Sequence, residues 1–262
     1  MERMLLIREV SLRRRLVKYI SSFEGIDLNK VNLDNLKELD FKINESFKRV
    51  RTNITFSGEN INAIAITSSA PNEGKTEVSF NIARSFADDG KKVLYIDADI
   101  RKSVVVVRYG ADIETKGLSH YLSGQSELDD IVYETNLDGL YIIFTGTKSP
   151  NPAELLGSEK FKKMIETLKE DYDYIIIDCP PLGSVIDAVL VAKVCDGSIL
   201  VIESDYVSYK VVQNVKKQLE KGGCKILGAI LNKVPNGGKG YYGYHKGNYG
   251  YYDSYGYGEK KK

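Results

Sequence analysis

Apolar and polar positions follow two distinct patterns along the chain, one typical of strands and the other of helices. Short apolar runs, rich in Ile and Val, predict strands at residues 61–67, 92–97, 139–145, 173–178, 197–203 and 225–232. Between most of them, apolar residues recur at helical spacing and predict helices at residues 75–89, 153–170, 186–195 and 207–221. Strands separated by helices predict an α/β fold with three layers, in which helices cover both faces of a mostly parallel central sheet.

The segments that flank this alternation differ from it in composition. In residues 4–20, apolar residues at helical spacing with Arg and Lys between them predict a basic amphipathic helix. Such a helix could bind an anionic membrane surface or a partner, and the alternative is that it is solvated. A polar connector is predicted at 21–35, and residues 36–56 again show the helical period. Residues 237–258 contain eight Tyr and eight Gly, a composition that cannot bury a core and predicts a flexible tail.

We therefore divide the chain into three parts. They are a basic, helical N-terminal extension (1–35), an α/β domain (36–235) and a Tyr/Gly-rich tail (236–262).

Composition narrows the possible environments of this chain. The 262 residues carry a formal net charge of only +1, so the chain as a whole gives no strong case for nucleic acid binding. No run reaches the roughly eighteen apolar residues that a membrane span needs, and residues 1–20 are too basic for a signal peptide. Three cysteines in apolar segments fit buried thiols of a reducing compartment better than disulfides. We therefore expect a cytoplasmic protein, attached to a membrane only through its basic N-terminus or a partner.

Residues 69–76 have the sequence form of a phosphate-binding P-loop. They read Ser-Ala-Pro-Asn-Glu-Gly-Lys-Thr and follow a β-branched strand. Backbone N–H groups and the N-terminus of the next helix can hold the phosphates of a nucleoside triphosphate there. Lys75 would reach the β- and γ-phosphates, and the Thr76 hydroxyl would bind Mg²⁺. Asn72 occupies a position that often carries Gly, and Asn tolerates the positive φ that closes such a loop. The predicted nucleotide-binding residues of the loop are Ser69, Asn72, Glu73, Gly74, Lys75 and Thr76.

Two further motifs place acidic residues at the carboxyl ends of predicted strands. One apolar run ends in Asp97-Ala98-Asp99, and a second ends in Asp178 ahead of two prolines. Because ligands of parallel sheets bind at the carboxyl ends of strands, we expect these carboxylates to lie opposite the P-loop. Asp97 and Asp178, with Thr76, are the predicted Mg²⁺ ligands. Asp99 is the predicted acceptor of a proton from an attacking hydroxyl.

The combination of motifs resembles the bacterial tyrosine kinases of capsular and exopolysaccharide assembly, in the soluble cytoplasmic form of Gram-positive bacteria. In that family the P-loop is followed by a run ending Asp-x-Asp-x-Arg, here residues 97–101, and by one ending Asp-x-x-Pro, here residues 178–181. Residues 149–156 look like the family's Asn-Pro-x-Glu-Leu segment, and a Tyr-rich C-terminus completes the pattern. Ser103 departs from it, since the family would have Pro after Arg-Lys. The resemblance covers about residue 45 to the end and implies a P-loop NTPase fold.

The resemblance also implies self-association. Residues 45–53 look like the family's helix motif Glu-x-x-Arg-x-x-Arg, represented here by Glu45, Lys48 and Arg51, and this motif implies a ring-shaped homo-oligomer such as an octamer. Lys48 replaces the first Arg, which keeps the charge but loses the bidentate guanidinium. A solvated charged helix face is the alternative interpretation.

Partners follow from the resemblance as well. It implies a transmembrane polysaccharide co-polymerase that activates the kinase at the inner face of the plasma membrane, and a cognate tyrosine phosphatase. Asn232, at the end of the last strand, is a predicted adenine contact by analogy with this fold class.

The hypothesis from the sequence is ATP-dependent autophosphorylation of the tail, in trans within a ring, which regulates polysaccharide synthesis and export. The predicted catalytic residues are Lys75, Asp97 and Asp99, and ATP with Mg²⁺ is the predicted cofactor. Glycines between the tyrosines would let the tail extend into a neighbouring active site. The candidate acceptors are Tyr241, Tyr242, Tyr244, Tyr249, Tyr251, Tyr252, Tyr255 and Tyr257.

Three alternatives stay open at this point. A septum-positioning or plasmid-partition ATPase shares the fold and uses ATP to dimerise on a membrane or on DNA. Such proteins carry an extra Lys four residues before the last Gly of the loop, where this chain has Ala70. A regulatory, non-enzymatic partner of a polysaccharide exporter is the second alternative. The third is that the tail is a low-complexity segment that only adheres to partners.

Overall fold

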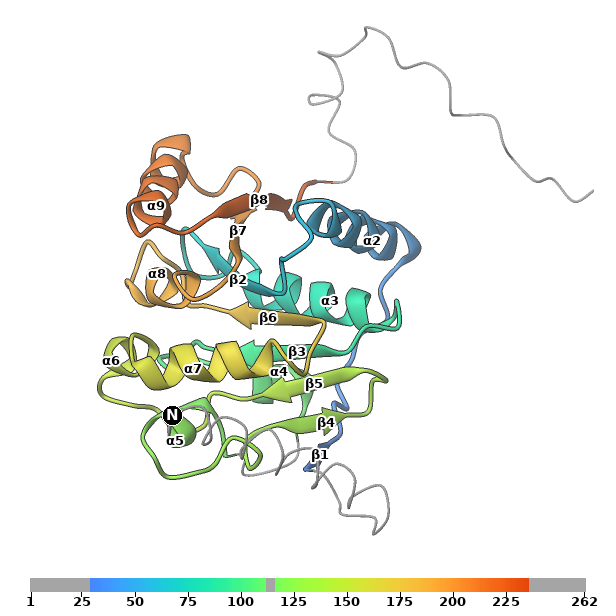
Figure 1. Ribbon diagram of the computed structural model, residues 1–262. Helices are drawn as coiled ribbons and strands as arrows, with labels where there is room; N and C mark the ends of the chain where they lie inside the picture. Colours follow the sequence, from blue (N-terminus) through green and yellow to red (C-terminus); the bar gives the residue numbers. More distant parts are fainter. Residues whose placement is uncertain (1–28, 112–115, 236–262) are drawn as a thin grey trace, which may run out of the picture.

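The computed structural model describes residues 29–111 and 116–235. The basic helix expected at 4–20 and all eight tail tyrosines therefore lie outside the described residues. Within them, one sheet holds eight strands in the order β1-β4-β5-β3-β6-β2-β7-β8 (Figure 1).

The sheet is parallel at all but one of its pairings. The strands are β1 (Lys30–Val31), β2 (Ala63–Ser68), β3 (Val93–Asp97), β4 (Tyr133–Thr135), β5 (Leu140–Ile143), β6 (Tyr174–Asp178), β7 (Gly197–Glu203) and β8 (Ile226–Asn232). Among these strands only β4 and β5 pair antiparallel. The central strands β2, β3 and β6 are buried on both faces, which explains why their sequences are continuous apolar runs without alternation.

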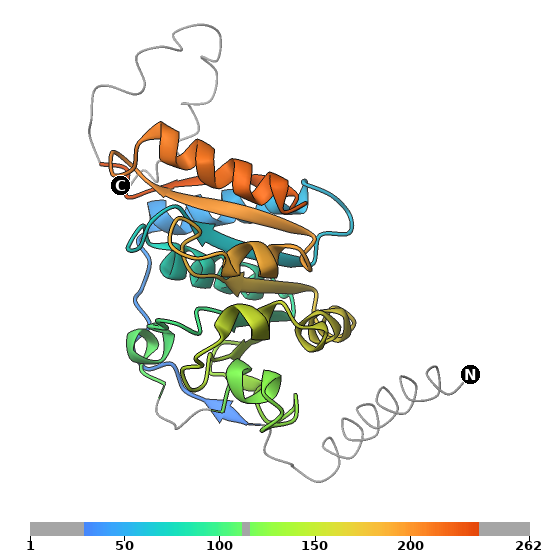
Figure 2. The same cartoon turned by 90° about the vertical axis from the view of Figure 1, so that its left-hand side faces the viewer.

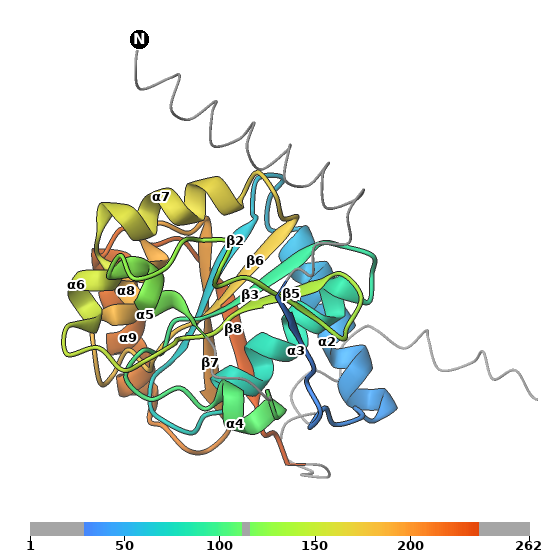
Figure 3. The ribbon, with the colours of Figure 1, turned by 90° about the horizontal axis from the view of Figure 1, so that it is seen from below.

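Helices cover both faces of the sheet, as the sequence predicts. The first face carries α2 (Phe41–Thr55), α3 (Lys75–Ala87) and α4 (Val105–Tyr109). The second face, turned toward the viewer in Figure 2, carries α5 (Leu118–Leu122), α6 (Pro152–Leu156), α7 (Glu159–Leu168), α8 (Asp187–Ala192) and α9 (Tyr209–Lys221). The buried apolar residues accordingly fall into two clusters, one on each side of the sheet (Figure 3). The three-layer architecture is confirmed.

The helix predicted at 153–170 is in fact two helices, α6 and α7. Helix α6 ends at Leu156 with Gly157 as its C-cap, and the Ser158 side chain accepts a hydrogen bond from the N–H of Phe161 as the N-cap of α7. A serine in this role satisfies a backbone donor at the start of a new helix. The apolar residues therefore keep their helical spacing in the sequence, although the chain forms two separate helices. The short elements β1, β4, α4 and α5 were not predicted, because two to five residues are too few to display a period.

The connector predicted at 21–35 is wrong for its last residues. Strand β1 pairs with β4, and Val31 and Leu33 are buried, with only 3% and 1% of their surface exposed. The Leu33 N–H also donates to the Asn136 side chain over 2.9 Å. The folded domain therefore includes Lys30 and the residues that follow it. The sequence did not reveal this, because two apolar side chains in alternate positions are too few to give a recognisable pattern.

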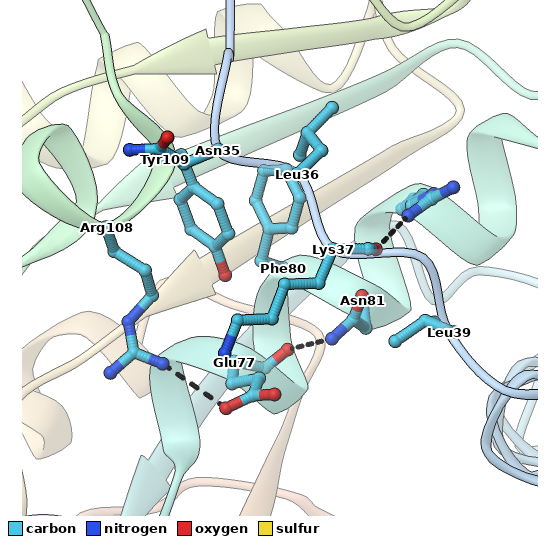
Figure 4. A pocket seen from close by; sticks show the side chains of 10 residues that line it. Asn35, Leu36, Lys37, Leu39, Glu77, Phe80, Asn81, Arg108 and Tyr109 are labelled. Atoms are coloured by element: carbon cyan, nitrogen blue, oxygen red, sulfur yellow. Dashed lines mark hydrogen bonds and ion pairs between the residues drawn. The ribbon is translucent and has the colours of Figure 1, made fainter.

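Residues 35–39 continue from this strand across the first face as a strap. They line a pocket with Phe80 of α3 and Tyr109 of α4, whose rings stack with centroids 4.0 Å apart (Figure 4). Arg84 of α3 donates to the backbone carbonyl of Lys37 in the strap over 3.3 Å. The strap thus ties the edge of the sheet to the helix that follows the P-loop.

Helix α2 packs on α3 through its C-terminal half. The Asp40 side chain caps its first turn by accepting from the Ile43 N–H over 2.8 Å. Of the apolar residues at helical spacing in α2, Ile54 is buried and Phe47 and Val50 are half-buried. Ile43 is 45% exposed, because the first turns of the helix extend past the core.

A substitution two residues after β1 tests whether this segment belongs to the domain. Leu33→Ala is expected to lower the free energy of unfolding by about 2–5 kcal/mol, because it leaves a cavity in the core. Chemical denaturation measures this change. Val107→Ala, at a site 83% exposed, is the control and should change stability by less than about 0.5 kcal/mol. A cost for Leu33→Ala as small as that of the control would mean that the segment only rests on the surface.

Candidate active site

The P-loop connects β2 to α3 and has the backbone of a phosphate cradle. Asn72 has φ 68° and Gly74 has φ 88°, both in the left-handed region. Asn72 therefore closes the loop in the conformation expected from the sequence. Helix α3 begins directly after Gly74, at Lys75, so the positive end of ten or more aligned peptide dipoles faces the loop.

The loop is braced from inside by Glu73, whose side chain is fully buried. One carboxylate oxygen accepts from the Ala70 N–H over 2.7 Å, and the other accepts from the Glu203 N–H at the end of β7 over 3.3 Å. Both oxygens of the Glu73 side chain therefore already accept hydrogen bonds within the protein. Its backbone N–H is the group that can face a phosphate.

The end of β8 holds the same loop from outside. The Asn232 side chain donates to the Glu73 carbonyl over 2.9 Å, and a Cβ on Gly74 would lie 2.2 Å from its nitrogen. Lys233 donates to the Asn72 carbonyl and pairs with Glu203, each over 2.8 Å. Asn232 thus lies beside the loop, and its contact with adenine stays a prediction. The roles of Glu203 and Lys233 were missed. Lone charged residues thirty positions apart give no signal in a sequence.

The four predicted charged residues meet at one point, at the carboxyl ends of β3 and β6. Lys75 Nζ lies 3.3 Å from Asp99 Oδ2 and 3.6 Å from Asp178 Oδ1. Asp97 and Asp178 are directly opposite each other as partners of neighbouring strands. Asp97 accepts from the Asp99 N–H over 3.2 Å and from the hydroxyl of Ser103.

Burial and mutual repulsion dominate the electrostatics of this cluster. Burial raises the pKa of Asp97 to about 8, and the nearby Asp178 adds to this rise. Burial also raises the pKa of Asp178, although the cation of Lys75 opposes it. For Lys75, burial alone would lower the pKa, but the carboxylates of Asp178, Asp99 and Asp97 outweigh it and the pKa is raised. Lys75 is therefore held as a cation among the acidic groups.

The residues fit a magnesium-bound nucleotide. Both oxygens of Asp178 and the hydroxyl of Ser69 are buried without a hydrogen-bond partner, an arrangement that a ligand would satisfy. The Thr76 hydroxyl is near the same point, 3.3 Å from Lys75 Nζ. Within residues 29–111 and 116–235, no three His, Cys, Asp or Glu side chains form a cage that could hold a metal without other ligands. Mg²⁺ usually takes one or two carboxylates and completes its shell with phosphates and water.

The segment after β6 is packed against the P-loop. The Thr67 hydroxyl donates to the Pro180 carbonyl over 2.8 Å, and the Gly183 N–H donates to the Ser69 carbonyl over 3.1 Å. A Cβ on Gly183 would lie only 2.1 Å from that carbonyl oxygen, so glycine is required for the close approach. Arg101, the last residue of the first acidic motif, forms a two-pronged ion pair with the buried Asp187 of α8.

The three residues of the expected oligomerisation motif lie elsewhere, on α2. Lys48 pairs with Glu45 over 2.8 Å on an exposed face. Arg51 instead turns toward its own domain, where it donates to the Ser85 carbonyl over 2.6 Å and pairs with Asp89.

Comparisons with known proteins show the family to which this chain belongs. An AAA domain model matches residues 61–224. The chain is 46% identical over 209 residues to the tyrosine-protein kinase CpsD of Streptococcus agalactiae, covering 80% of this chain and 90% of that one. It is also similar to the kinase domain of the Escherichia coli tyrosine kinase ETK, with 33% identity, a TM-score of 0.72 and coverage of 79% and 80%. The chain belongs to the bacterial tyrosine kinases.

The fold is shared more widely than the kinase family. The septum site-determining protein MinD of Pyrococcus horikoshii, solved with Mg-ADP, matches with 29% identity and a TM-score of 0.56, over 65% of this kinase and 70% of that chain. In the described part of this kinase, none of the helices has both the length and the apolar character needed to cross a membrane.

The raised pKa of Asp97 predicts how stability changes with pH. The unfolded chain loses this proton near pH 4, so between about pH 4 and pH 8 the folded state binds more protons than the unfolded one. The free energy of unfolding should therefore fall as the pH rises through this range. Asp97→Asn is expected to flatten the fall, measured as the melting temperature between about pH 5.5 and pH 8.5 in EDTA.

The matched control is Asp138→Asn, which changes an exposed carboxylate away from the site. It should keep the wild-type slope. If Asp97→Asn keeps that slope as well, Asp97 titrates like an ordinary surface carboxylate and the electrostatic description of the site is wrong.

Proposed function

We propose that this kinase uses ATP to phosphorylate tyrosines of its own C-terminal tail. The proposal is supported above all by Lys75, which lies between Asp99 and Asp178 at the mouth of the P-loop. The position of the tail in the sequence also supports the proposal. Lys233 contacts the P-loop, and Tyr241 follows Lys233 by only eight residues.

The charges of the site suit phosphoryl transfer. Lys75 would neutralise negative charge that develops on the transferred phosphoryl group. The backbone N–H groups of the loop would orient the phosphates. Thr76, Asp97 and Asp178 would hold Mg²⁺, whose positive charge would offset that of the phosphates.

Asp99 is the proposed base. The tyrosine oxygen forms a bond to the γ-phosphorus, the bond from that phosphorus to the β–γ bridging oxygen breaks, and ADP leaves. The hydroxyl proton passes to the Asp99 carboxylate. Asp99 is 6% exposed. One of its carboxylate oxygens accepts a hydrogen bond from Lys75 over 3.3 Å, and the other accepts from the Lys102 N–H over 3.0 Å, so the carboxylate is oriented from both sides.

Transfer in trans is proposed from the length of the tail and from α2. A tail of residues 236–262 would span roughly 90 Å if fully extended, enough to reach a neighbouring subunit. Ring assembly would use the exposed Glu45–Lys48 pair on α2. Each phosphate adds nearly two negative charges, so a multiply phosphorylated tail would repel its neighbours and loosen the ring.

The proposed biological role is control of capsular or exopolysaccharide synthesis and export. It is supported by the similarity to CpsD. In this proposal a transmembrane co-polymerase recruits the kinase to the inner face of the plasma membrane and activates it, and a cognate tyrosine phosphatase resets it.

Incubation with Mg²⁺ and ATP, followed by mass mapping, tests the activity. Phosphate is expected on tail tyrosines of the wild type. Lys75→Met should lower the signal by about 100-fold or more, and Asp99→Asn by about 10²–10⁴-fold. Lys162→Met, at an exposed position of α7, is the control and should behave like the wild type.

Mixing two variants tests the direction of transfer. One carries Lys75→Met with an intact tail, and the other keeps the site but has all eight tail tyrosines changed to Phe. Phosphate on the Lys75→Met tail is expected. Its absence would contradict transfer in trans, and ATP hydrolysis without any phosphotyrosine in the wild type would favour the partition-type ATPase instead.

Oligomer formation is tested on α2. Replacing both Glu45 and Lys48 by Ala should shift the kinase toward the monomer, measured by size-exclusion chromatography with light scattering. Arg51 is left intact because it makes contacts within its own domain. The control is the same double change at Lys216 and Glu220, a comparable exposed pair on α9. An unchanged mass for the α2 variant would exclude this surface as the ring contact.

A further inference from the structure

Unlike Asp99 and Asp178, Asp97 has no ion pair with Lys75 to compensate its negative charge. Lys75 lies within 4.0 Å of Asp99 and Asp178, whereas in the described part of the chain no cationic side chain comes that close to Asp97. Asp97 is nevertheless fully buried. Its two oxygens are satisfied by one N–H, from Asp99, and one hydroxyl, from Ser103.

The hydroxyl of Ser103 is held in place from its other side. It accepts a hydrogen bond from the Val105 N–H over 3.3 Å, at the first residue of α4. Because Val105 donates to the hydroxyl oxygen, the hydroxyl proton remains available for Asp97. Val105 is completely buried, so this start of α4 is fixed on the core. Ser103 therefore connects a rigid point of the fold to one particular oxygen of Asp97.

We infer that Ser103 is a positioning residue for magnesium binding, which holds the Asp97 carboxylate in the orientation that faces the metal. The inference rests on the proposed role of Asp97 as a Mg²⁺ ligand. Without this hydroxyl, one oxygen of Asp97 would lose its hydrogen-bond partner, and the side chain would be free to rotate away from that orientation. Hydrogen bonds to a metal-binding carboxylate orient it in this way, and their loss typically weakens metal affinity by 10- to 100-fold.

Binding of the fluorescent nucleotide mant-ADP, with and without Mg²⁺, tests the inference without any need for kinase activity. In EDTA, Ser103→Ala should bind mant-ADP within about twofold of the wild type, since no P-loop group is changed. The Mg²⁺ concentration at the midpoint of the metal-dependent tightening should rise by about tenfold or more. Ser103→Thr keeps a hydroxyl and should restore the wild-type midpoint to within about threefold. Ser103→Pro places the family's residue there, has no hydroxyl, and should follow Ser103→Ala.

Controls separate positioning from a general loss of structure. Ser123→Ala, which removes an exposed hydroxyl at the end of α5, should leave the midpoint unchanged. A wild-type midpoint in Ser103→Ala would overturn the inference. If Ser103→Ala weakens mant-ADP binding in EDTA as much as it weakens binding with Mg²⁺, the inference is also overturned, because Ser103 would then only support the loop. If Ser103→Ala does not fold, the difference between Ser103→Thr and Ser103→Pro decides by the same criteria.

The wild type distinguishes this inference from the proposed function. If Mg²⁺ does not tighten mant-ADP binding to the wild type, the proposed metal site itself is wrong. If Mg²⁺ does so but no tyrosine is phosphorylated, the kinase mechanism fails while the role of Ser103 can still be measured.

Discussion

The site depends on one buried cation among buried acids. Lys75 compensates carboxylates that β3 and β6 bring out of water side by side, and the sheet itself imposes this proximity, because Asp97 and Asp178 are partners in its register. Burying such charges is costly unless each is paired or hydrogen-bonded. The arrangement is tolerated because Lys75 stands at the first turn of a helix that is anchored in the core. The oxygens of Asp178, which have no hydrogen-bond partner, are groups that a bound metal would satisfy.

The loop that carries Lys75 is held by residues from distant parts of the chain. Glu73 bonds to the end of β7, and Asn232 and Lys233 bond to the loop from the end of β8. Asn72 and Lys233 both adopt positive φ, a costly conformation that persists because surrounding contacts determine it. Strand β8 is also where the described domain meets the tyrosine-rich tail. The segment that leads to the tail is therefore part of the support of the nucleotide site.

A second support runs along the first face of the sheet. The loop after β3 carries Asp97 and Asp99, then Ser103, and leads into α4, whose Tyr109 stacks on Phe80 of α3. The strap from β1 closes over this contact (Figure 4). The acidic loop and the P-loop helix are thus packed together twice, once through charge at the site and once through apolar contact behind it. Such double packing keeps the catalytic groups in register without any single strong interaction.

The sequence by itself determined the elements whose patterns are long and whose chemistry is local. Apolar runs predicted the central strands, and Gly74-Lys75-Thr76 with the strand-end aspartates predicted the candidate site and the family. Loop geometry and strand polarity follow from residues that are neighbours in the chain. Tertiary structure alone decided what depends on contacts between distant residues. Glu73 and Arg51 turned inward to brace the domain, Val31 became part of the sheet, Leu33 was buried in the core, and Ser103 acquired Asp97 as a partner. These outcomes could not be predicted, since the partner of each side chain is chosen by packing and carries no periodic or motif signal.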